Sequence, residues 1–328
     1  MAVMVAGGAG YIGSHTVAEL LQRGREVVVV DNLTKGHKES VLGGKLCIGD
    51  IRDEAFMDSV FAQNNIDSVI HFAADIEVGL SMKDPLVFYR NNVYTVICML
   101  ESMKKHGVKN IVFSSTAAVY GYPKDVPIHE DSEKNPVNPY GDTKLAVEKM
   151  LRWCDEAYGI TWAAPRYFNA AGAHESGMIG EDHDPETHVT PIILQAAMGQ
   201  RDCMRVFGDD YDTPDGTCIR DYIHVTDLAD AHILALDYLK NGGESVSFNL
   251  GSGNGYTVME LINKVKEVTG TDFKVEFSPR REGDPAKLVA DSSKARQLLG
   301  WNPKKEDLGI IVESAWKWHV SHPSGFRK

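Results

Sequence analysis

The chain has 328 residues, of which 43% are hydrophobic and 24% are charged, and this length is sufficient for one large domain or two fused ones with a sizeable core. Its formal net charge of -12 at pH 7 argues against nucleic acid or an anionic membrane as the main partner, because both bind basic patches. An anionic ligand must therefore be held by a few local arginine or lysine residues.

The five cysteines are scattered along the chain without Cys-x-x-Cys spacing, and an odd number cannot pair completely within one chain. We interpret them as reduced thiols. The N-terminus does not resemble a signal peptide, and no apolar run approaches the roughly 18 residues of a membrane span. We therefore expect a cytoplasmic protein.

Short β-branched segments alternate with longer amphipathic segments over the first 168 residues. The short segments are apolar throughout, as is typical of parallel strands covered on both faces. This alternation predicts an α/β protein with a Rossmann-type, doubly wound parallel sheet. The expected strands are residues 3–5, 26–30, 69–72 and 111–113, and the clearest expected helices are residues 11–23 and 92–106.

A glycine-rich turn, GGAGYIG at residues 7–13, follows the first strand and opens a helix. Its glycines allow backbone N–H groups to approach a pyrophosphate at the positive end of that helix. A single glycine motif would be weak evidence. Here the strand, the motif, the helix and a second strand that ends in Asp31 form the complete unit, which favours dinucleotide binding.

Asp31 is placed to accept hydrogen bonds from the adenosine ribose hydroxyls and to repel a 2′-phosphate, which favours NAD over NADP. Two alternatives stay open: Asp31 could simply begin a turn, and the nearby Lys35 could receive a phosphate. Asp50 and Ile51 follow a short third strand and are placed to contact adenine. A turn carboxylate accounts for Asp50 nearly as well.

Tyr140 and Lys144 are spaced i,i+4 at an expected helix start, so both side chains lie on one face of that helix. This spacing is also common on solvated helices. Its position after a strand that ends in Ser114-Ser115-Thr116, within a dinucleotide domain, favours proton and hydride transfer. Lowering the tyrosine pKa from near 10 to about 7 requires roughly 4 kcal/mol, which a neighbouring ammonium and a nicotinamide cation would supply.

The character of the sequence changes near residue 169, where long polar loops begin. We expect an NAD-binding Rossmann domain over residues 1–168, whose sheet a strand near residues 247–250 could rejoin. A smaller C-terminal α+β substrate-binding domain is expected over residues 169–328. A C-terminal helix over residues 306–319 is predicted by an apolar stripe of Leu308, Ile311, Val312, Ala315 and Trp316.

One loop contains residues of the types that bind metal ions: Glu181, Asp182, His183, Asp184 and His188. The spacing of these residues matches no recognised metal motif. We interpret the segment as a polar surface loop and expect no metal there.

The chain resembles the extended short-chain dehydrogenase/reductase family, and most closely its UDP-galactose 4-epimerase branch. The similarity runs nearly from end to end, which is more specific than any single motif. Besides the motifs above, it is carried by VIHFAA (69–74), NNV (91–93), FSSTAAVYG (113–121), RYFN (166–169), GED (180–182), RDYIH (220–224) and RREGD (280–284).

The resemblance implies an NAD-dependent isomerase of galactose metabolism that interconverts UDP-glucose and UDP-galactose through a 4-keto sugar. Tyr140 would take the proton of the 4-hydroxyl, Thr116 would hydrogen-bond that oxygen, and Lys144 would bind the nicotinamide ribose and tune Tyr140. The implied NAD-binding set is Gly7, Gly10, Tyr11, Ile12, Gly13, Asp31, Asn32, Asp50, Ile51, Phe72, Ala73, Ala74, Asn92, Ser114, Tyr140, Lys144 and Tyr167.

The resemblance also implies a UDP-sugar site and a homodimer. Helices like those that start near Asn92 and Lys144 form the dimer in most family members. Leu288 stands where side-chain bulk controls access of N-acetylated sugars, so UDP-N-acetylhexosamines stay open as further substrates. The implied substrate-binding set is Thr116, Asn169, Phe207, Arg220, Arg281, Asp284 and Leu288.

Three positions depart from the family pattern: Ala6, Ile76 and Pro165. Proline lacks a backbone donor and should weaken pairing within an interior strand unless a bulge or edge accommodates it. Ile76 replaces a cofactor-contacting lysine of some relatives. Rival activities begin with the same oxidation, but dehydratases and decarboxylases carry acidic residues beside the central threonine, where this chain has Ala117-Ala118. A silent cofactor-binding regulator would commonly have lost the Tyr140–Lys144 pair.

Overall fold

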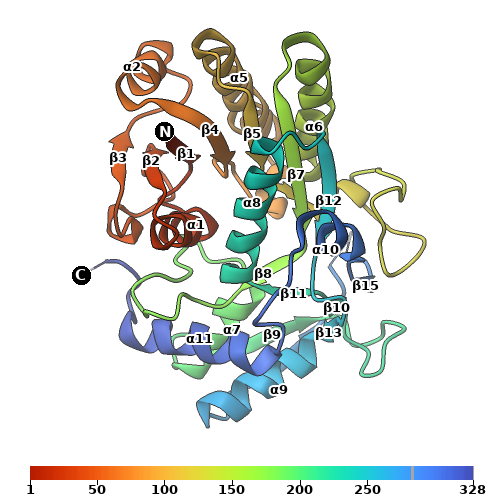
Figure 1. Ribbon diagram of the computed structural model, residues 1–328. Helices are drawn as coiled ribbons and strands as arrows, with labels where there is room; N and C mark the ends of the chain where they lie inside the picture. Colours follow the sequence, from red (N-terminus) through yellow and green to blue (C-terminus); the bar gives the residue numbers. More distant parts are fainter. Residues whose placement is uncertain (282–283, 328) are drawn as a thin grey trace.

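A parallel sheet forms the centre of the computed structural model, which describes residues 1–281 and 284–327 (Figure 1). The strand order is β3-β2-β1-β4-β5-β7-β12, and the short β6 also pairs with β7. The expected doubly wound α/β fold is confirmed. The strands are β1 (Ala2–Ala6), β2 (Glu26–Asp31), β3 (Lys45–Ile48), β4 (Ile66–His71), β5 (Asn110–Phe113), β6 (Ser115–Thr116), β7 (Thr161–Tyr167) and β12 (Val246–Leu250).

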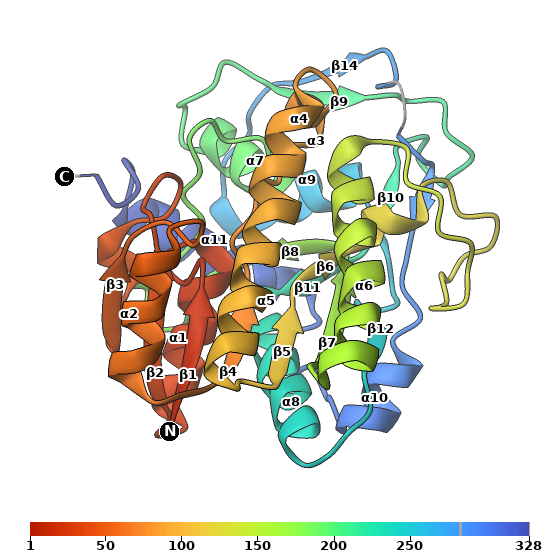
Figure 2. The ribbon, with the colours of Figure 1, turned by 90° about the horizontal axis from the view of Figure 1, so that it is seen from above.

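Helices cover both faces of this sheet, so side chains of β1 enter two different cores. Val3 and Val5 face α1 (Tyr11–Gln22) and α8 (Val225–Lys240), whereas Met4 faces the opposite layer. Figure 2 shows that opposite layer, where α2 (Glu54–Asn64), α5 (Thr95–His106) and α6 (Pro139–Tyr158) lie along one face. Burial on both faces explains why the strands are apolar throughout.

Pro165 lies inside β7 without disrupting the sheet. On one side, β7 pairs with β5 only through residues 161–163 and with β6 through Arg166 and Tyr167, so the ladder is interrupted at Ala164 and Pro165. On the other side, the register with β12 is continuous and places Phe248 opposite Pro165. The gap between β5 and β6 therefore accommodates a residue that lacks a backbone donor.

A smaller layer of three helices packs beside the carboxyl ends of the central strands. These helices are α7 (Val189–Ala197), α9 (Val258–Thr269) and α11 (Leu308–Ser321), and they share one apolar core. Short strand pairs complete this part: β8 (Asn169–Ala171) with β11 (Tyr222–His224), β9 (Met204–Phe207) with β14 (Val275–Ser278), and β10 (Ile219–Arg220) with β13 (Tyr256–Thr257) and β15 (Lys287–Leu288).

The chain passes more than once between the two parts. Both α8 and β12 follow residue 169 in sequence, yet α8 packs on the central sheet and β12 extends it. The remaining short helices are η1 (Lys38–Ser40), α3 (Val78–Ser81), α4 (Pro85–Phe88), η2 (Tyr89–Tyr94), η3 (Ala117–Tyr120) and α10 (Ser293–Leu299). The division of function at residues 168 and 169 stays a prediction.

The C-terminal helix was expected over residues 306–319 and runs over Leu308–Ser321. Its carboxylate cap, Asp307, accepts the backbone N–H groups of Gly309 and Ile310. Trp316 is only partly buried, whereas Trp318, which was not included in the predicted stripe, is 1% exposed. The buried stripe therefore continues from Ala315 to Trp318, one i+3 step along the helix.

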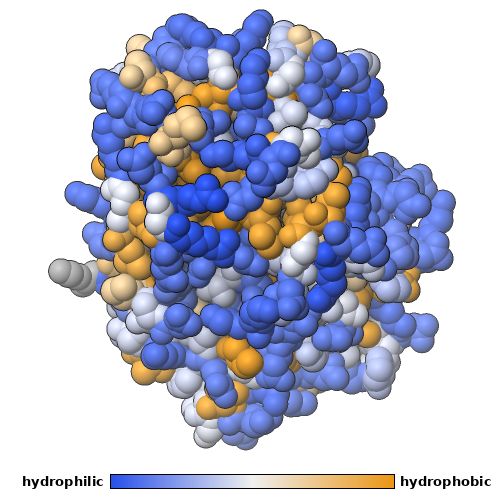
Figure 3. Space-filling model, viewed as in Figure 1, coloured by the Kyte–Doolittle hydropathy of each residue, from blue (hydrophilic) through white to orange (hydrophobic). Residues whose placement is uncertain are grey.

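The surface of the molecule is mostly hydrophilic, and apolar side chains gather across the middle of the face seen in Figure 3. Among the described residues, no helix has both the length and the apolar character needed to cross a membrane.

A buried ion pair joins β7 to α6. Arg166 and Glu148 are 2% and 5% exposed, and the Arg166 Nε donates to Glu148 Oε1 over 2.9 Å. Arg166 Nη1 also donates to the Tyr120 hydroxyl at 2.8 Å, and the Ser115 hydroxyl donates to Glu148. Each charge is thereby compensated away from water.

We predict that Arg166→Met lowers the free energy of unfolding by about 3–5 kcal/mol, because it leaves the Glu148 carboxylate buried without its partner. Urea denaturation measures this loss. The control is Arg152→Met, since Arg152 and Glu156 form an exposed pair on α6 with side chains 62% and 59% exposed. That change should cost less than about 1 kcal/mol. Equal losses in both variants would contradict the assignment.

Candidate active site

A cavity of about 550 Å³ opens at the carboxyl ends of the central strands and continues into the smaller part of the molecule. Its wall begins at the glycine turn after β1, passes the start of α6, and reaches β10 and β15. This is the place where open α/β sheets bind ligands, because the connections after the strands diverge there.

The glycine turn needs its glycines because other backbone atoms lie where a side chain would begin. A Cβ on Gly7 would lie 2.6 Å from the backbone nitrogen of Ala73, and Gly7 has a φ of +75°, which side chains rarely adopt. A Cβ on Gly13 would lie 2.2 Å from the carbonyl oxygen of Gly7. Gly10 is the N-cap of α1 and supplies no side-chain cap, so the first N–H groups of the helix lack intrahelical partners and suit a phosphate group.

The expected adenosine contacts lie along the same wall. Asp31 is buried, and its carboxylate accepts the backbone N–H groups of Ala9 at 3.0 Å and Leu33 at 2.8 Å. Burial raises the pKa of Asp31, and these two hydrogen bonds oppose the shift. Asn32, Asp50 and Ile51 also line the cavity.

Lys35, the alternative phosphate ligand, also lies on the wall, where its Nζ is 2.8 Å from a carboxylate oxygen of Glu77. Its charge is therefore compensated within the wall. Asp50 is likewise paired: hydrogen bonds from Arg52 hold the pKa of Asp50 below its ordinary value.

Phe72, Ala73 and Ala74 line the cavity after β4, but Asn92 lies behind its wall. The buried amide of Asn92 accepts from the backbone N–H of Asp75 and donates to the carbonyl oxygen of the same residue. Asn92 thus holds the segment after β4 in place. Its neighbour Asn91 lies on the wall and was not predicted, because adjacent asparagines give no signal of which one faces inward.

Tyr140 and Thr116 meet on the cavity wall from two different elements. Tyr140 lies in the first turn of α6, which begins at Pro139 and is capped by Asn138 accepting the Gly141 N–H at 2.8 Å. Thr116 ends β6 and caps η3 by accepting the Ala118 N–H at 3.2 Å. Tyr167, at the end of β7, lines the cavity beside them and pairs with the Ser114 hydroxyl at 3.0 Å.

Lys144 lies one turn after Tyr140, fully inside the protein. Its Nζ donates to the carbonyl oxygen of Ser114 at 2.8 Å and lies 5.9 Å from the centre of the Tyr140 ring. Burial lowers the pKa of Lys144 to about 7. Burial also raises the pKa of Tyr140 well above its ordinary value, while the Thr116 hydroxyl opposes that shift.

At the other end of the cavity lie Asn169, Arg220, Asp284 and Leu288. The Nη2 of Arg220 is 3.4 Å from Asp284 Oδ1, and its Nη1 is held by the carbonyl oxygen of Pro285 at 2.9 Å.

Two predicted residues, Phe207 and Arg281, lie outside the cavity wall. The exposed Arg281 guanidinium is 3.9 Å from the centre of the Phe207 ring. Glu282 and Gly283, within the RREGD motif of residues 280–284, lie outside the described residues.

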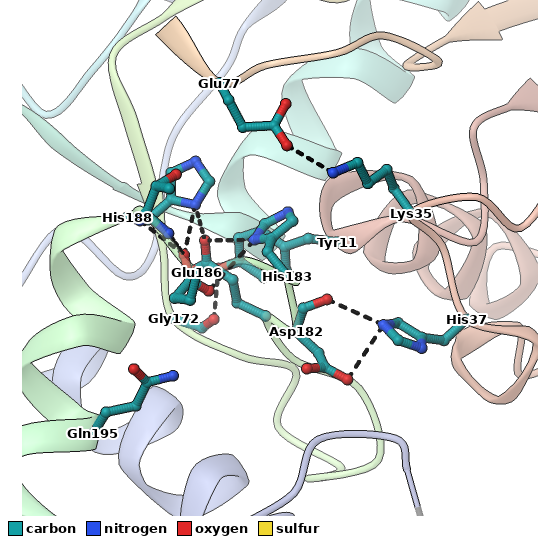
Figure 4. Close-up of polar contacts among 12 residues, drawn as sticks. Tyr11, Lys35, His37, Glu77, Gly172, Asp182, His183, Glu186, His188 and Gln195 are labelled. Carbon is teal, nitrogen blue, oxygen red and sulfur yellow. Dashed lines mark hydrogen bonds and ion pairs between the residues drawn. The ribbon is translucent and has the colours of Figure 1, made fainter. Parts of the chain in front are cut away.

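The loop before α7 forms another part of the wall, and the expectation of a polar surface loop was wrong for Glu181 and Glu186, whose side chains are each 5% exposed, although Asp184, Pro185 and Thr187 are exposed. Glu181 is 5% exposed, and one ligand atom each of His183, Glu186 and His188 lies within 4.8 Å of its carboxylate. Figure 4 shows these three partners close together.

Asp182 contacts His37, which lies in the segment after β2 and donates its backbone N–H to the carbonyl oxygen of Ala9 in the glycine turn. The inner side of the loop is covered where the His183 ring packs against Tyr11 at the start of α1, a contact between distant segments that local polarity does not reveal.

Comparison with known proteins agrees with this geometry. The family model described as GDP-mannose 4,6 dehydratase matches residues 4–311. The UDP-glucose 4-epimerase of Halalkalibacterium halodurans is 55% identical over 99% of this chain and 98% of its own. The chain belongs to the UDP-glucose 4-epimerase family. The family resemblance inferred from the sequence motifs is therefore confirmed.

Further members of the epimerase family match to a similar extent. The UDP-glucose 4-epimerase of Lacticaseibacillus casei is 54% identical over 99% of both chains. A crystal structure of a UDP-glucose 4-epimerase superimposes with a TM-score of 0.98 at 53% identity over all of both chains. The epimerase of Bifidobacterium longum, solved in complex with NAD+ and UDP, gives a TM-score of 0.94 at 43% identity over 99% of this chain and all of the other.

We predict that Gly13→Ala lowers the free energy of unfolding by about 1–3 kcal/mol and weakens dinucleotide binding, because its Cβ would collide with the Gly7 carbonyl. Thermal melting and dinucleotide titration measure the two effects. Gly79→Ala is the matched control, since Gly79 is an exposed helical glycine with open space around its Cβ position. Unchanged dinucleotide affinity in Gly13→Ala would argue against a role for this turn.

Proposed function

We propose that this protein interconverts UDP-glucose and UDP-galactose by inverting carbon 4 of the sugar through a 4-keto intermediate, with tightly bound NAD. The observation that carries this proposal is the meeting of Tyr140 and Thr116 on one cavity that runs from the glycine turn to Arg220. One end suits a dinucleotide pyrophosphate and the other suits a nucleoside diphosphate, so the reacting carbon would lie between them.

Each residue has its own part in the chemistry. Tyr140 takes the proton from the 4-hydroxyl, and Thr116 hydrogen-bonds the same oxygen. The glycine turn and Asp31 would hold NAD, which would supply the hydride chemistry: uptake of the hydride from carbon 4 and, once the keto sugar has turned over, its return to the other face, while Tyr140 gives the proton back to the same oxygen. Lys144 binds the nicotinamide ribose. No net oxidation results, which makes the reaction an isomerisation.

The charges near Tyr140 support a site in which the cofactor is held tightly and in its oxidised form. Burial raises the pKa of Tyr140 well above its ordinary value, so on its own the phenol stays protonated at neutral pH and cannot accept a proton. A nicotinamide cation beside the phenol stabilises the phenolate, as does a protonated Lys144. Proton abstraction is thereby coupled to the presence of cofactor in its oxidised form.

The matching family model bears the name of a dehydratase, and one pair of residues argues against that reaction here. Elimination of water from the sugar needs an acid or base beside the central threonine. Ala117 and Ala118 follow Thr116, and neither side chain can transfer a proton. Epimerisation needs no such group.

The nucleotide anchor is proposed to be Arg220 and Asp284, with Asn169 beside them. A guanidinium group matches diphosphate oxygens, and a carboxylate can bind ribose hydroxyls. Phe207 and Arg281 are proposed to join them when the substrate enters, since the two side chains pack together and the carbonyl oxygen of Arg281 accepts the backbone N–H of Asp284 on the wall at 3.4 Å.

We propose that the protein is a cytoplasmic homodimer, with its smaller part after residue 168 binding the nucleotide sugar. Apolar side chains lie exposed on η2 and α6, including Tyr94 at 50% and Trp153 at 58% exposure. Both elements cover the same face of the sheet (Figure 2). An interface there would bury them without closing the cavity.

The first experiment is to incubate the purified protein with UDP-galactose, without added cofactor, and to separate the products by chromatography. Conversion to UDP-glucose is expected, with NAD recovered from the denatured protein. Absence of conversion after NAD is supplied, in folded protein that binds NAD, would overturn the assignment.

Within this assay, Tyr140→Phe should lower the turnover number by about 10²–10⁴-fold, because the proton acceptor is lost while the ring still packs. The bound NAD content should not change. Tyr158→Phe, at the exposed end of the same helix, is the matched control and should retain full turnover. A Tyr140→Phe enzyme with normal turnover would exclude Tyr140 as the base.

Leu288 is expected to set the range of sugars accepted, since it lines the cavity near Arg220. Leu288→Tyr should reduce the rate with UDP-N-acetylgalactosamine relative to UDP-galactose by about tenfold or more through steric exclusion, and Leu288→Ala should raise this ratio. The neighbouring exposed Lys287→Ala provides the control. Identical ratios in all three variants would place the specificity elsewhere.

A further inference from the structure

Four side chains of the loop before α7 converge on one point, and three of them, His183, Glu186 and His188, are labelled in Figure 4. They are Glu181, His183, Glu186 and His188, and one ligand atom from each lies within 4.8 Å of all the others. Both histidines direct their Nδ1 atoms toward both carboxylates. The four nitrogen-to-oxygen distances are 3.4 Å for His183–Glu181, 3.5 Å for His183–Glu186, 3.1 Å for His188–Glu181 and 3.0 Å for His188–Glu186.

Ordinary ion pairs account for this arrangement poorly. Each Nδ1 carries at most one proton, yet each faces two carboxylates, so two protons would serve four contacts. The His188–Glu186 contact at 3.0 Å is an ordinary hydrogen bond. The two contacts of His183, at 3.4 and 3.5 Å, are clearly longer than the 2.7–2.9 Å or so of a charge-assisted N–H···O bond. The Nδ1 of His183 is buried and has no hydrogen-bond partner among the described residues.

The same distances suit a tetrahedral metal ion. Zinc bound at about 2.0–2.1 Å to nitrogen and oxygen ligands places those ligands about 3.3–3.4 Å apart along the edges of a tetrahedron. The separations from Glu181 Oε1, 3.4 Å to His183 and 3.1 Å to His188, lie on either side of that value, as do those of 3.5 Å and 3.0 Å from the two oxygens of Glu186. Two imidazoles with two carboxylates are a ligand set that zinc accepts, and their charges with one divalent ion sum to zero.

The surroundings hold the ligands in position. The Oε1 atom of Glu186 accepts the backbone N–H groups of Thr187 and His188, each at 2.8 Å, which orients the carboxylate. The His183 ring packs edge-on against Tyr11, with ring centres 6.2 Å apart. The cluster therefore lies directly behind the first turn of α1, on the wall of the cavity.

We propose that Glu181, His183, Glu186 and His188 bind one divalent transition-metal ion, zinc by ligand chemistry, as a structural site. With all four positions taken by protein ligands, the ion has no open position for substrate. It fastens residues 181–188 against Tyr11 and so fixes one wall of the dinucleotide cavity. The metal site is independent of the reaction proposed for the cavity, because it concerns metal content and stability.

Metal content of the purified holoenzyme tests this directly. Protein freed of any histidine tag is incubated with Zn2+, desalted and analysed by elemental mass spectrometry. We expect one zinc per chain in the wild type and in His129→Asn, a control histidine that is exposed and outside the cluster. In His183→Asn and Glu186→Gln, affinity for zinc should fall about 10- to 100-fold or more. Wild-type protein with zinc no higher than its variants would overturn the proposal.

A second measurement needs no variant, so it holds even if the substitutions impair folding. Wild-type holoenzyme is treated with a chelator, and its melting temperature is followed while Zn2+ or Mg2+ is returned. We expect a lower melting temperature after chelation and its recovery at one equivalent of Zn2+, but not with Mg2+, which prefers six oxygen ligands. A melting temperature unaffected by both chelation and Zn2+ would overturn the site.

Discussion

The buried ion pair between Arg166 and Glu148 connects the segments that carry the proposed chemistry. Arg166 belongs to β7, one residue before Tyr167, and Glu148 lies on α6, one turn after Lys144. The same pair binds Ser115, next to Thr116, and Tyr120 at the end of η3. Because a buried charge tolerates no loss of its partner, the pair holds β6, β7 and α6 in one relative position. The distance between Tyr140 and Thr116 follows from it.

The groups that would bind anionic ligands are a few local ones, and the net charge of the whole chain does not reveal them. An overall charge of -12 would repel two anionic ligands, yet the cavity offers them backbone N–H groups at one end and Arg220 at the other. Nearby cations such as Lys35 and Arg52 are neutralised by acidic partners on the wall. The site thus attracts phosphate groups at defined points and leaves the centre, around Tyr140, free of fixed charge except for Lys144.

The parts of the fold and site that depend on residues close together in the sequence could be predicted from it. The glycine turn, Asp31, and the Tyr140–Lys144 spacing are local patterns, and the structure places the glycine turn, Asp31 and Tyr140 on one cavity. Long-range packing could not be predicted in this way. The loop at residues 181–188 is polar in composition, yet its inner side is covered where His183 packs against Tyr11, and nothing within the loop signals that contact. Asn92 faces away from the cavity for a similar reason, since its partner Asp75 belongs to another segment.

The outer position of β12 bears on how the chain folds during synthesis. Until residues 246–250 leave the ribosome, β7 has no partner on that side and exposes an unpaired edge, which is prone to join other chains. α8, which precedes β12 in sequence, covers the same region of the sheet. The strands on either side of the glycine turn therefore belong to the N-terminal half of the chain. That half cannot complete the central sheet by itself. Completion of the central sheet waits for about three quarters of the polypeptide, so the edge of β7 is exposed to other chains for most of synthesis.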